Sequence, residues 1–389
     1  MQANPPRMQK LRILVFFLPI YFSSLLTGLQ FGDFRVFNHN QVLAVGSNIS
    51  PLAAGELDLV SDRMEKLLKK YRFNGSIVIS FKGYQIYSNT VGLADFTRKD
   101  SLTTNAPFQL ASVSKSFTAM SIMILKERGL LNFDDTVQSH IPEFPYDKIT
   151  IRHLLNHTSG LPNYIYLAEK YWPKDVDMSN EDMMELLVRH KQPLYFKPGS
   201  RFDYSNTGYA VLALLVERES GISFGDFVRT NIFEPLGMFH TFTHNPGRLD
   251  TLAVQVKGYH YPARRGNEYP SDPVNHVLGD KSVYSTAEDL ALYDRAWVSP
   301  LLVSDSTLQE AYTKSVLNNK REVNYGFGWR FKVVEGKDVV FHNGLWHGFT
   351  STITRFVDSD LTVIVLTNTS SKVGYIVSDV ARTFDGILL

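Results

Sequence analysis

Runs of apolar and β-branched residues mark strand-rich regions near both ends of the chain. Residues 75–81 form such a run, and residues 85–91 form another after the turn Lys82-Gly83-Tyr84, so the two predict a β-hairpin. Four further runs near the C-terminus have the same character: residues 327–334, 339–342, 349–356 and 361–367. We therefore expect strands from both ends of the chain to meet in one antiparallel sheet.

Helical spacing of apolar positions accounts for most of the remaining chain. Residues 56–71 place apolar side chains on one helix face, and residues 208–220 and 373–384 also have helical patterns. Residues 118–125 are apolar on nearly all sides, which predicts a buried helix that ends before Gly129. Residues 131–275 are dominated by helical patterns separated by proline and glycine.

These patterns predict an α+β fold in which helices flank an antiparallel sheet. Residues 56–130 and 276–389 would form the α/β domain, and residues 131–275 would form a mainly helical domain inserted into it. The length of 389 residues agrees with two domains.

Composition and charge exclude several classes of protein. The chain has 40 basic and 39 acidic residues, a formal net charge of +1, and a nucleic-acid-binding protein usually carries a basic excess. With 44% hydrophobic and 20% charged residues, the chain is neither disordered nor a polytopic membrane protein. It contains no cysteine, which rules out disulfides, thiol nucleophiles and thiolate metal sites.

The N-terminus has the pattern of a secretory signal. Arg7, Lys10 and Arg12 precede the apolar run 13–26, which is shorter than the roughly 20 residues of a membrane-spanning helix. Leu29 occupies the position where a lipoprotein signal has cysteine, so lipidation there is excluded. We interpret residues 1–29 as a signal peptide or N-terminal anchor and residues 30–55 as a linker. Whether this segment is a cleaved signal peptide or a retained anchor, we expect the protein to be exported, to the periplasm or to the outer side of the membrane.

The tetrapeptide Ser112-Val113-Ser114-Lys115 opens the predicted buried helix, just after the strand-like residues 107–110. Residues i and i+3 share a helix face, so the Lys115 amine is expected beside the Ser112 hydroxyl. Burial lowers the pKa of a lysine amine, which can then act as the base that a serine nucleophile needs. The same spacing also occurs as a helix cap with a surface charge. However, Lys115 stands where the helix becomes buried, an expensive place for a lone charge.

Two further motifs carry groups suited to the same chemistry. In Tyr204-Ser205-Asn206, the phenol can relay a proton to a leaving group and the amide can bind a substrate carbonyl. In His342-Asn343-Gly344, the glycine permits close approach to a strand and the imidazole can donate to a carboxylate or hydroxyl. Tyr87-Ser88-Asn89 has the form of the first motif, but it lies in the predicted hairpin and is interpreted as structural.

Together, the three motifs resemble those of the serine β-lactamase and penicillin-binding protein superfamily. The resemblance is to its class C-like branch, which includes D,D-peptidases, esterases and D-amino-acid peptidases. It extends from about residue 56 to residue 389 and includes five supporting stretches: residues 149–162, 196–209, 235–238, 284–290 and 325–329. It implies the same fold as the patterns above, with the site between the sheet and the helical domain.

The resemblance also implies a role for each matching residue. Ser112 would be the acylated nucleophile, Lys115 its base partner and Tyr204 the proton relay. The groups that would bind the substrate or its oxyanion are Asn206, His342, Gly344 and the backbone N–H groups of Ser112 and Leu345. This chemistry needs no metal and no cofactor.

The third motif departs from the pattern of class C β-lactamases, which have Lys-Thr-Gly there. His342 replaces the lysine, and a histidine with a near-normal pKa is mostly neutral at pH 7. Recognition of a substrate carboxylate by a fixed charge is then weakened, and efficient β-lactam hydrolysis is not expected. A near-normal His342 also predicts that the rate changes between about pH 5.5 and 7.5. Asn156 stands where relatives usually carry threonine, a change we expect the structure to tolerate.

Two other motifs point to different chemistry and are weaker. Residues 221–225 fit Gly-x-Ser-x-Gly, but they follow a helical run rather than a strand, and Ser223 with Asp226 looks like the start of a helix. His153 and His157 have zinc-site spacing, but no glutamate follows His153.

The leading hypothesis is an exported serine hydrolase that works through an acyl-enzyme on Ser112. Its substrate is a peptide, cleaved as by a D,D-carboxypeptidase, or an ester or β-lactam, with specificity in residues 164–178 and 259–275. The alternative is a penicillin-binding or sensing module of the same fold that does not turn over.

Overall fold

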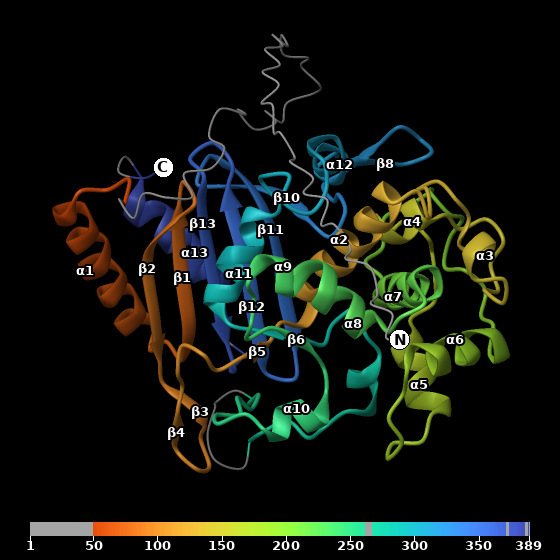
Figure 1. The fold of residues 1–389 in the computed structure, drawn as a ribbon, viewed down its shortest axis with the longest axis horizontal. Helices are drawn as coiled ribbons and strands as arrows, with labels where there is room; N and C mark the ends of the chain where they lie inside the picture. The colour runs from red at the N-terminus through yellow and green to blue at the C-terminus, as the bar shows by residue number, and fades with distance from the viewer. Residues whose placement is uncertain (1–49, 261–266, 371–372, 386–387, 389) are drawn as a thin grey trace, which may run out of the picture. The chain divides into compact units, whose positions relative to one another are not determined.

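Two distant stretches of chain form one six-stranded antiparallel sheet (Figure 1). The computed structural model describes residues 50–260, 267–370, 373–385 and 388. In spatial order, the strands are β10 (Arg330–Val334), β11 (Lys337–Trp346), β12 (Phe349–Phe356), β13 (Leu361–Thr367), β1 (Gly75–Phe81) and β2 (Tyr84–Val91). The contact between the two stretches is the β1–β13 pair, with Gly75 opposite Thr367. The predicted hairpin and the predicted joining of both ends in one sheet are confirmed.

Two strand boundaries differ from the sequence prediction. The strand expected at 327–334 begins only at Arg330, because Gly328 takes a left-handed φ of +75° and packs its backbone against Ser116. The strand expected at 339–342 extends to Trp346, because residues as far as Trp346 pair with β12. Pairing with β10 stops earlier, at Phe341. The part of β11 that follows Phe341 therefore pairs on one side only.

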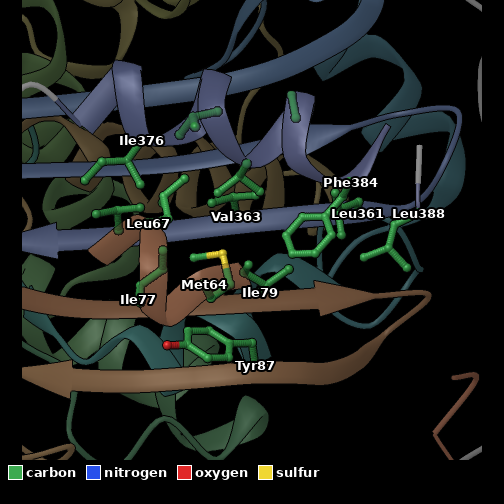
Figure 2. Close-up of a cluster of buried hydrophobic side chains, with 14 of the residues drawn as sticks. Met64, Leu67, Ile77, Ile79, Tyr87, Leu361, Val363, Ile376, Phe384 and Leu388 are labelled. Atoms are coloured by element: carbon green, nitrogen blue, oxygen red, sulfur yellow. The ribbon is translucent and has the colours of Figure 1, made fainter. Parts of the chain in front are cut away.

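One face of the sheet is covered by the helices α1 (Ala54–Tyr71) and α13 (Val373–Phe384). Figure 2 shows their apolar side chains against the strands, with Met64 and Leu67 from α1 and Ile376 and Phe384 from α13. Tyr87 of β2 belongs to this core and is 8% exposed, in agreement with a structural role. The core is thus built from the two ends of the described chain.

The other face of the sheet is covered by α11 (Ala287–Arg295), against which α2 (Ser114–Glu127) packs. The Phe117 ring of α2 stacks on the Tyr293 ring of α11 at a centroid distance of 3.8 Å. Every residue of α2 from Ser114 to Leu125 is buried, and the apolar pattern predicted this for residues 118–125. A helix buried on all sides holds its side chains in fixed positions, which suits a catalytic group.

The helical region is organised around α7 (Asn206–Ser220), which is buried from Thr207 to Val216. Helix α7 contacts α2 and most of the shorter helices of the region, which are α3 (Val137–His140), α4 (Ile151–Leu155), α5 (Tyr164–Tyr171), α6 (Asn180–Arg189) and α8 (Phe224–Val228). A small sheet ties this region to the rest, because β7 (Val283–Ser285) pairs with both β5 (Phe108–Gln109) and β6 (Phe242–Thr243). The division into domains at residues 131 and 275 stays a prediction.

The predicted signal or anchor, residues 1–29, and most of the predicted linker lie outside the described residues. Among the residues that the structure does describe, no helix has both the length and the hydropathy needed to cross a bilayer.

Candidate active site

Ser112 lies in a tight turn between β5 and α2. Residues 111–113 form a single 3₁₀ turn that runs directly into α2, and Ala111 takes a φ of +49°, a left-handed conformation that is uncommon for a residue with a Cβ atom. Such conformations persist only where the surroundings enforce them. Here the surroundings include β11 and β12, and the Ser351 hydroxyl donates to the Leu110 carbonyl at 2.6 Å.

Gly344 of β11 makes this close approach to the Ser112 turn sterically possible. A Cβ atom at Gly344 would lie 2.2 Å from the Leu110 carbonyl oxygen and 2.4 Å from the Ser351 hydroxyl oxygen. Both distances are far below van der Waals contact. The glycine in the third motif is therefore required by packing against the turn that holds the serine.

Gly344→Ala is expected to displace the Ser112 turn and to cost about 1–3 kcal/mol of stability, as overpacking does. The measurement is the thermal midpoint together with the rate of Ser112 acylation, and both should fall. The matched control is Gly374→Ala, because Gly374 is exposed in α13 and no atom lies within 4 Å of its added Cβ. Equal effects of the two substitutions would contradict a specific role for Gly344.

The Lys115 amine is enclosed between three oxygen atoms. Its Nζ lies 3.1 Å from the Ser112 hydroxyl, 2.8 Å from the Asn206 side-chain oxygen and 2.6 Å from the backbone carbonyl of Asp280. Lys115 is 0% exposed, and burial lowers its pKa to about 7. Asp280 raises this pKa and Arg330 lowers it, but both effects are smaller than that of burial. A large fraction of Lys115 is thus unprotonated near neutral pH and can accept the serine proton.

Tyr204 brings a phenol to the same point from the segment that precedes α7. The Lys115 Nζ lies over its ring, 4.9 Å from the centroid. Burial raises the pKa of Tyr204, and the neighbouring Ser112 hydroxyl offsets this only in part. The phenol oxygen is buried, with the Ser112 hydroxyl and the Arg330 guanidinium as its polar neighbours. A phenol that stays protonated can donate to a leaving group, whereas Lys115 is the better base.

Asn206 is the first residue of α7 and is fixed by two contacts. Ser205 caps the helix by accepting from the Gly208 N–H, and the Asn206 side-chain oxygen accepts from Lys115. Its amide nitrogen forms no hydrogen bond within the described part of the chain, so it is free to donate to a substrate carbonyl.

His342 is buried and differs from the near-normal histidine that the sequence suggested. It is 1% exposed, and burial, with the charges of Lys115 and Arg330, lowers its pKa well below 6.5. Its Nδ1 lies 2.9 Å from its neighbour's carbonyl, Asn343 O, and its Nε2 lies 3.1 Å from the Tyr325 hydroxyl. The expectation that His342 titrates between pH 5.5 and 7.5 is therefore wrong.

The pH dependence of acylation is expected to follow Lys115 instead. With the unprotonated amine as the expected base, the rate should rise about tenfold per pH unit below pH 7 and level off above it. The measurement is the acylation rate from pH 5 to 9 for the wild type and His342→Gln. The midpoint should stay near 7 in both proteins. The rise of the rate with pH below pH 7 is the acid limb of this profile. Loss of the acid limb in His342→Gln would assign the titration to the histidine.

Arg330 is a charged residue of the site that sequence reasoning missed. Its guanidinium lies over the Tyr204 ring at 4.8 Å, and within the described ranges no carboxylate pairs with it. The only sequence signal is its position directly after the supporting stretch 325–329. Because arginine keeps its charge at all relevant pH values, Arg330 supplies the fixed cation that the neutral His342 does not.

His157, considered as a metal ligand from its spacing, instead supports the Tyr204 segment. Its Nδ1 accepts from the Ser205 N–H at 3.0 Å, and its ring packs on the Tyr204 ring at 4.3 Å. His153 has a local role, because its Nδ1 accepts from the Thr150 N–H at the start of α4. Both histidines therefore hold backbone in place.

The remaining sequence features also have structural explanations. Ser223 caps α8 by accepting from the Asp226 N–H, as its position after a helix suggested. Part of the expected specificity loop 164–178 is helical, because residues 164–171 form α5 and Tyr164 is fully buried. Leu345 is 67% exposed, on the part of β11 that pairs only with β12. Its backbone N–H as the second oxyanion donor stays a prediction.

A fold of this kind, with a serine, a buried lysine and a tyrosine meeting beside the part of β11 that pairs only with β12, is that of a β-lactamase-type serine hydrolase. The family model described as Beta-lactamase matches residues 60–384. The chain therefore belongs to the β-lactamase family and is a serine hydrolase of the β-lactamase-related type.

Individual relatives agree with this assignment. Penicillin-binding protein 4* of Bacillus subtilis is 37% identical over 325 residues, which are 80% of this chain and 71% of the relative. Protein flp of Staphylococcus aureus is 25% identical over 79% of this chain, but the match spans only 62% of protein flp. The crystal structure of a penicillin-binding protein from Bacillus halodurans superimposes with a TM-score of 0.70 at 28% identity, covering 82% of this chain and 99% of that one.

Proposed function

We propose that the protein is an exported serine hydrolase that cleaves peptides with a free C-terminal carboxylate, as a D,D-carboxypeptidase does. The observation that carries the proposal is the enclosed Lys115 amine, 3.1 Å from the Ser112 hydroxyl and with its pKa at about 7. Export rests on the basic and apolar pattern of residues 1–29.

In the acylation step, Ser112 Oγ attacks the substrate carbonyl carbon and its proton passes to Lys115 Nζ. The negative charge on the carbonyl oxygen would be stabilised by the backbone N–H groups of Ser112 and Leu345. When the C–N bond breaks, the leaving amine takes the phenol proton of Tyr204. Lys115 then passes the proton that it received from Ser112 to Tyr204. The products are the free amine and an ester on Ser112.

In the deacylation step, water attacks the Ser112 ester and loses a proton to the same lysine and tyrosine pair. The C–O bond to the enzyme breaks, Ser112 Oγ recovers its proton, and the acid leaves. All groups come from the chain itself, so no cofactor enters the scheme.

Arg330 supports a substrate that ends in a carboxylate. Its side chain is half-buried, and its guanidinium lies over the ring of Tyr204, the proposed proton donor to the leaving group. A permanent cation without a carboxylate partner, close to the leaving group, suits an amino acid that leaves with its own carboxylate. Esters of small acids have no carboxylate on the leaving group, so the enzyme should hydrolyse them more slowly.

The experiment compares two peptides that differ only at the C-terminus. One ends in D-Ala-D-Ala with a free carboxylate, and the matched control carries a C-terminal amide. Release of the terminal residue should be at least about tenfold faster from the free acid. Equal rates, or turnover of p-nitrophenyl esters with neither peptide cleaved, would contradict the proposed substrate class. Acylation of Ser112 by penicillin without peptide release would favour the non-turnover module.

A further inference from the structure

A second buried lysine, Lys281, directly follows Asp280, whose backbone carbonyl contacts Lys115, and takes no part in the steps above. Its side chain is 3% exposed. Its Nζ lies 3.3 Å from both carboxylate oxygens of Asp280 and donates to the Tyr164 hydroxyl at 2.5 Å. It also lies over the Trp346 ring, 5.2 Å from the centroid. A buried ammonium group is costly, so its retention here calls for an explanation.

Asp280 connects this second lysine to the first. Its backbone carbonyl accepts from Lys115 at 2.6 Å, and its carboxylate, whose side chain is 0% exposed, pairs with Lys281. The Tyr164 hydroxyl completes the cluster by donating to the same carboxylate at 3.2 Å. One residue therefore contacts Lys115 through its main chain and Lys281 through its side chain.

The segment that carries Asp280 and Lys281 is fixed along α2. The Thr118 hydroxyl donates to the Gly279 carbonyl at 2.7 Å, and the Val283 N–H donates to the Ser114 hydroxyl at 3.0 Å. These bonds hold the Asp280 carbonyl whether or not its carboxylate is charged. The charge of the pair can thus be changed by substitution without removing the backbone contact to Lys115.

We propose that the buried Asp280–Lys281 pair, held by Tyr164, is a charge-balancing unit that sets the proton affinity of the Lys115 amine. This inference rests on the proposed role of Lys115 as the base in acylation. Asp280 and Lys281 are positioning residues, because their side chains would act on the reaction only through the Lys115 amine, which the Asp280 backbone carbonyl holds.

The two charges act on Lys115 in opposite directions. The Asp280 carboxylate raises the pKa of Lys115, against the larger lowering by burial. Burial also lowers the pKa of Lys281, and repulsion from Lys115 adds a smaller lowering. Coulomb repulsion is reciprocal, so the Lys281 charge also disfavours protonated Lys115. The other titratable or charged groups around the two lysines are Tyr204, Tyr209, His157, His342, Arg330, Tyr164, Asp272, His347 and His244. Those groups stay unchanged when only the pair is substituted.

The test is the pH profile of Ser112 acylation by a fluorescent penicillin, from pH 5 to 9. Asp280→Asn keeps the backbone carbonyl and removes the negative charge, so the acid limb should move to lower pH by about 0.5–1 unit. Lys281→Met removes the positive charge and should move the limb to higher pH by a similar amount. A purely structural pair would not give shifts of opposite sign.

A double variant and a matched control complete the experiment. Lys281→Met alone leaves the buried Asp280 carboxylate without its ammonium partner, which is destabilising. The double variant Asp280→Asn/Lys281→Met removes both charges. Its acid limb should return toward that of the wild type. Lys257→Met is the control, because Lys257 pairs with the buried Asp95 at 3.2 Å, away from the residues around Lys115, and its profile should equal that of the wild type.

Two results would overturn the inference. In the first, both single variants shift the acid limb of the acylation profile in the same direction. In the second, the acid limb stays in place in both variants although Ser112 is still acylated. Failure of the proposed function itself looks different, because the wild type would then show no acylation of Ser112 at any pH.

Discussion

Ser112→Ala is expected to abolish turnover and to leave the fold intact. The serine oxygen is the one that lies 3.1 Å from the Lys115 amine, at the point where Tyr204 also converges. Loss of a nucleophile of this kind lowers kcat by about 10³-fold or more. Ser112 is only half-buried and its side chain does not cap a helix, so its loss should cost at most about 1 kcal/mol of stability.

The matched control for this prediction is Ser223→Ala, in the other serine motif. Ser223 caps α8, so its replacement should lower stability by about 1 kcal/mol and leave kcat/KM unchanged. The measurements are ester or peptide turnover and thermal unfolding for both variants. Unchanged turnover in Ser112→Ala would contradict the assignment of the nucleophile. Lost turnover in Ser223→Ala would instead favour the Gly-x-Ser-x-Gly motif at residues 221–225 as the nucleophile site.

Lys115→Met should lower the acylation rate by about 10²–10⁴-fold, the usual contribution of a positioned base. The more informative variant is Lys115→Arg. A guanidinium keeps the positive charge but cannot accept a proton near neutral pH, so Lys115→Arg should be as inactive as Lys115→Met.

The control for these variants lies on the same helix. Lys126→Met changes a lysine near the end of α2, whose Nζ donates to the Thr307 hydroxyl, and should keep full acylation activity. Acylation is followed by mass spectrometry and folding by circular dichroism. If Lys115→Arg retained activity, the lysine would act through its charge rather than as a base.

Much of the fold could be predicted because it depends on regular patterns. The hairpin of β1 and β2, the later strands and the buried helix α2 all follow from apolar spacing over several turns or strand residues. The approach of Lys115 to Ser112 also follows from the local geometry of a helix, since residues three apart share a face.

The parts that could not be predicted depend on long-range contacts. The Asp280 carbonyl that binds Lys115 is a backbone group, 165 positions away in the chain, and has no side-chain signature. The pKa of His342 was mispredicted because its burial is set by the packing of other elements, which its motif does not encode. Arg330 was missed for the same reason, since its place over the Tyr204 ring results from where β10 begins.

The most direct test of the central claim is intact-mass labelling of Ser112. The wild type and Ser112→Ala would be incubated with a fluorescent penicillin and with p-nitrophenyl butyrate, quenched in acid, weighed and mapped by peptide digestion. We expect the wild type to gain the mass of one acyl group, on the peptide that contains Ser112, and Ser112→Ala to gain none. An acyl group on another residue, or equal labelling of the two proteins, would contradict an acyl-enzyme on Ser112.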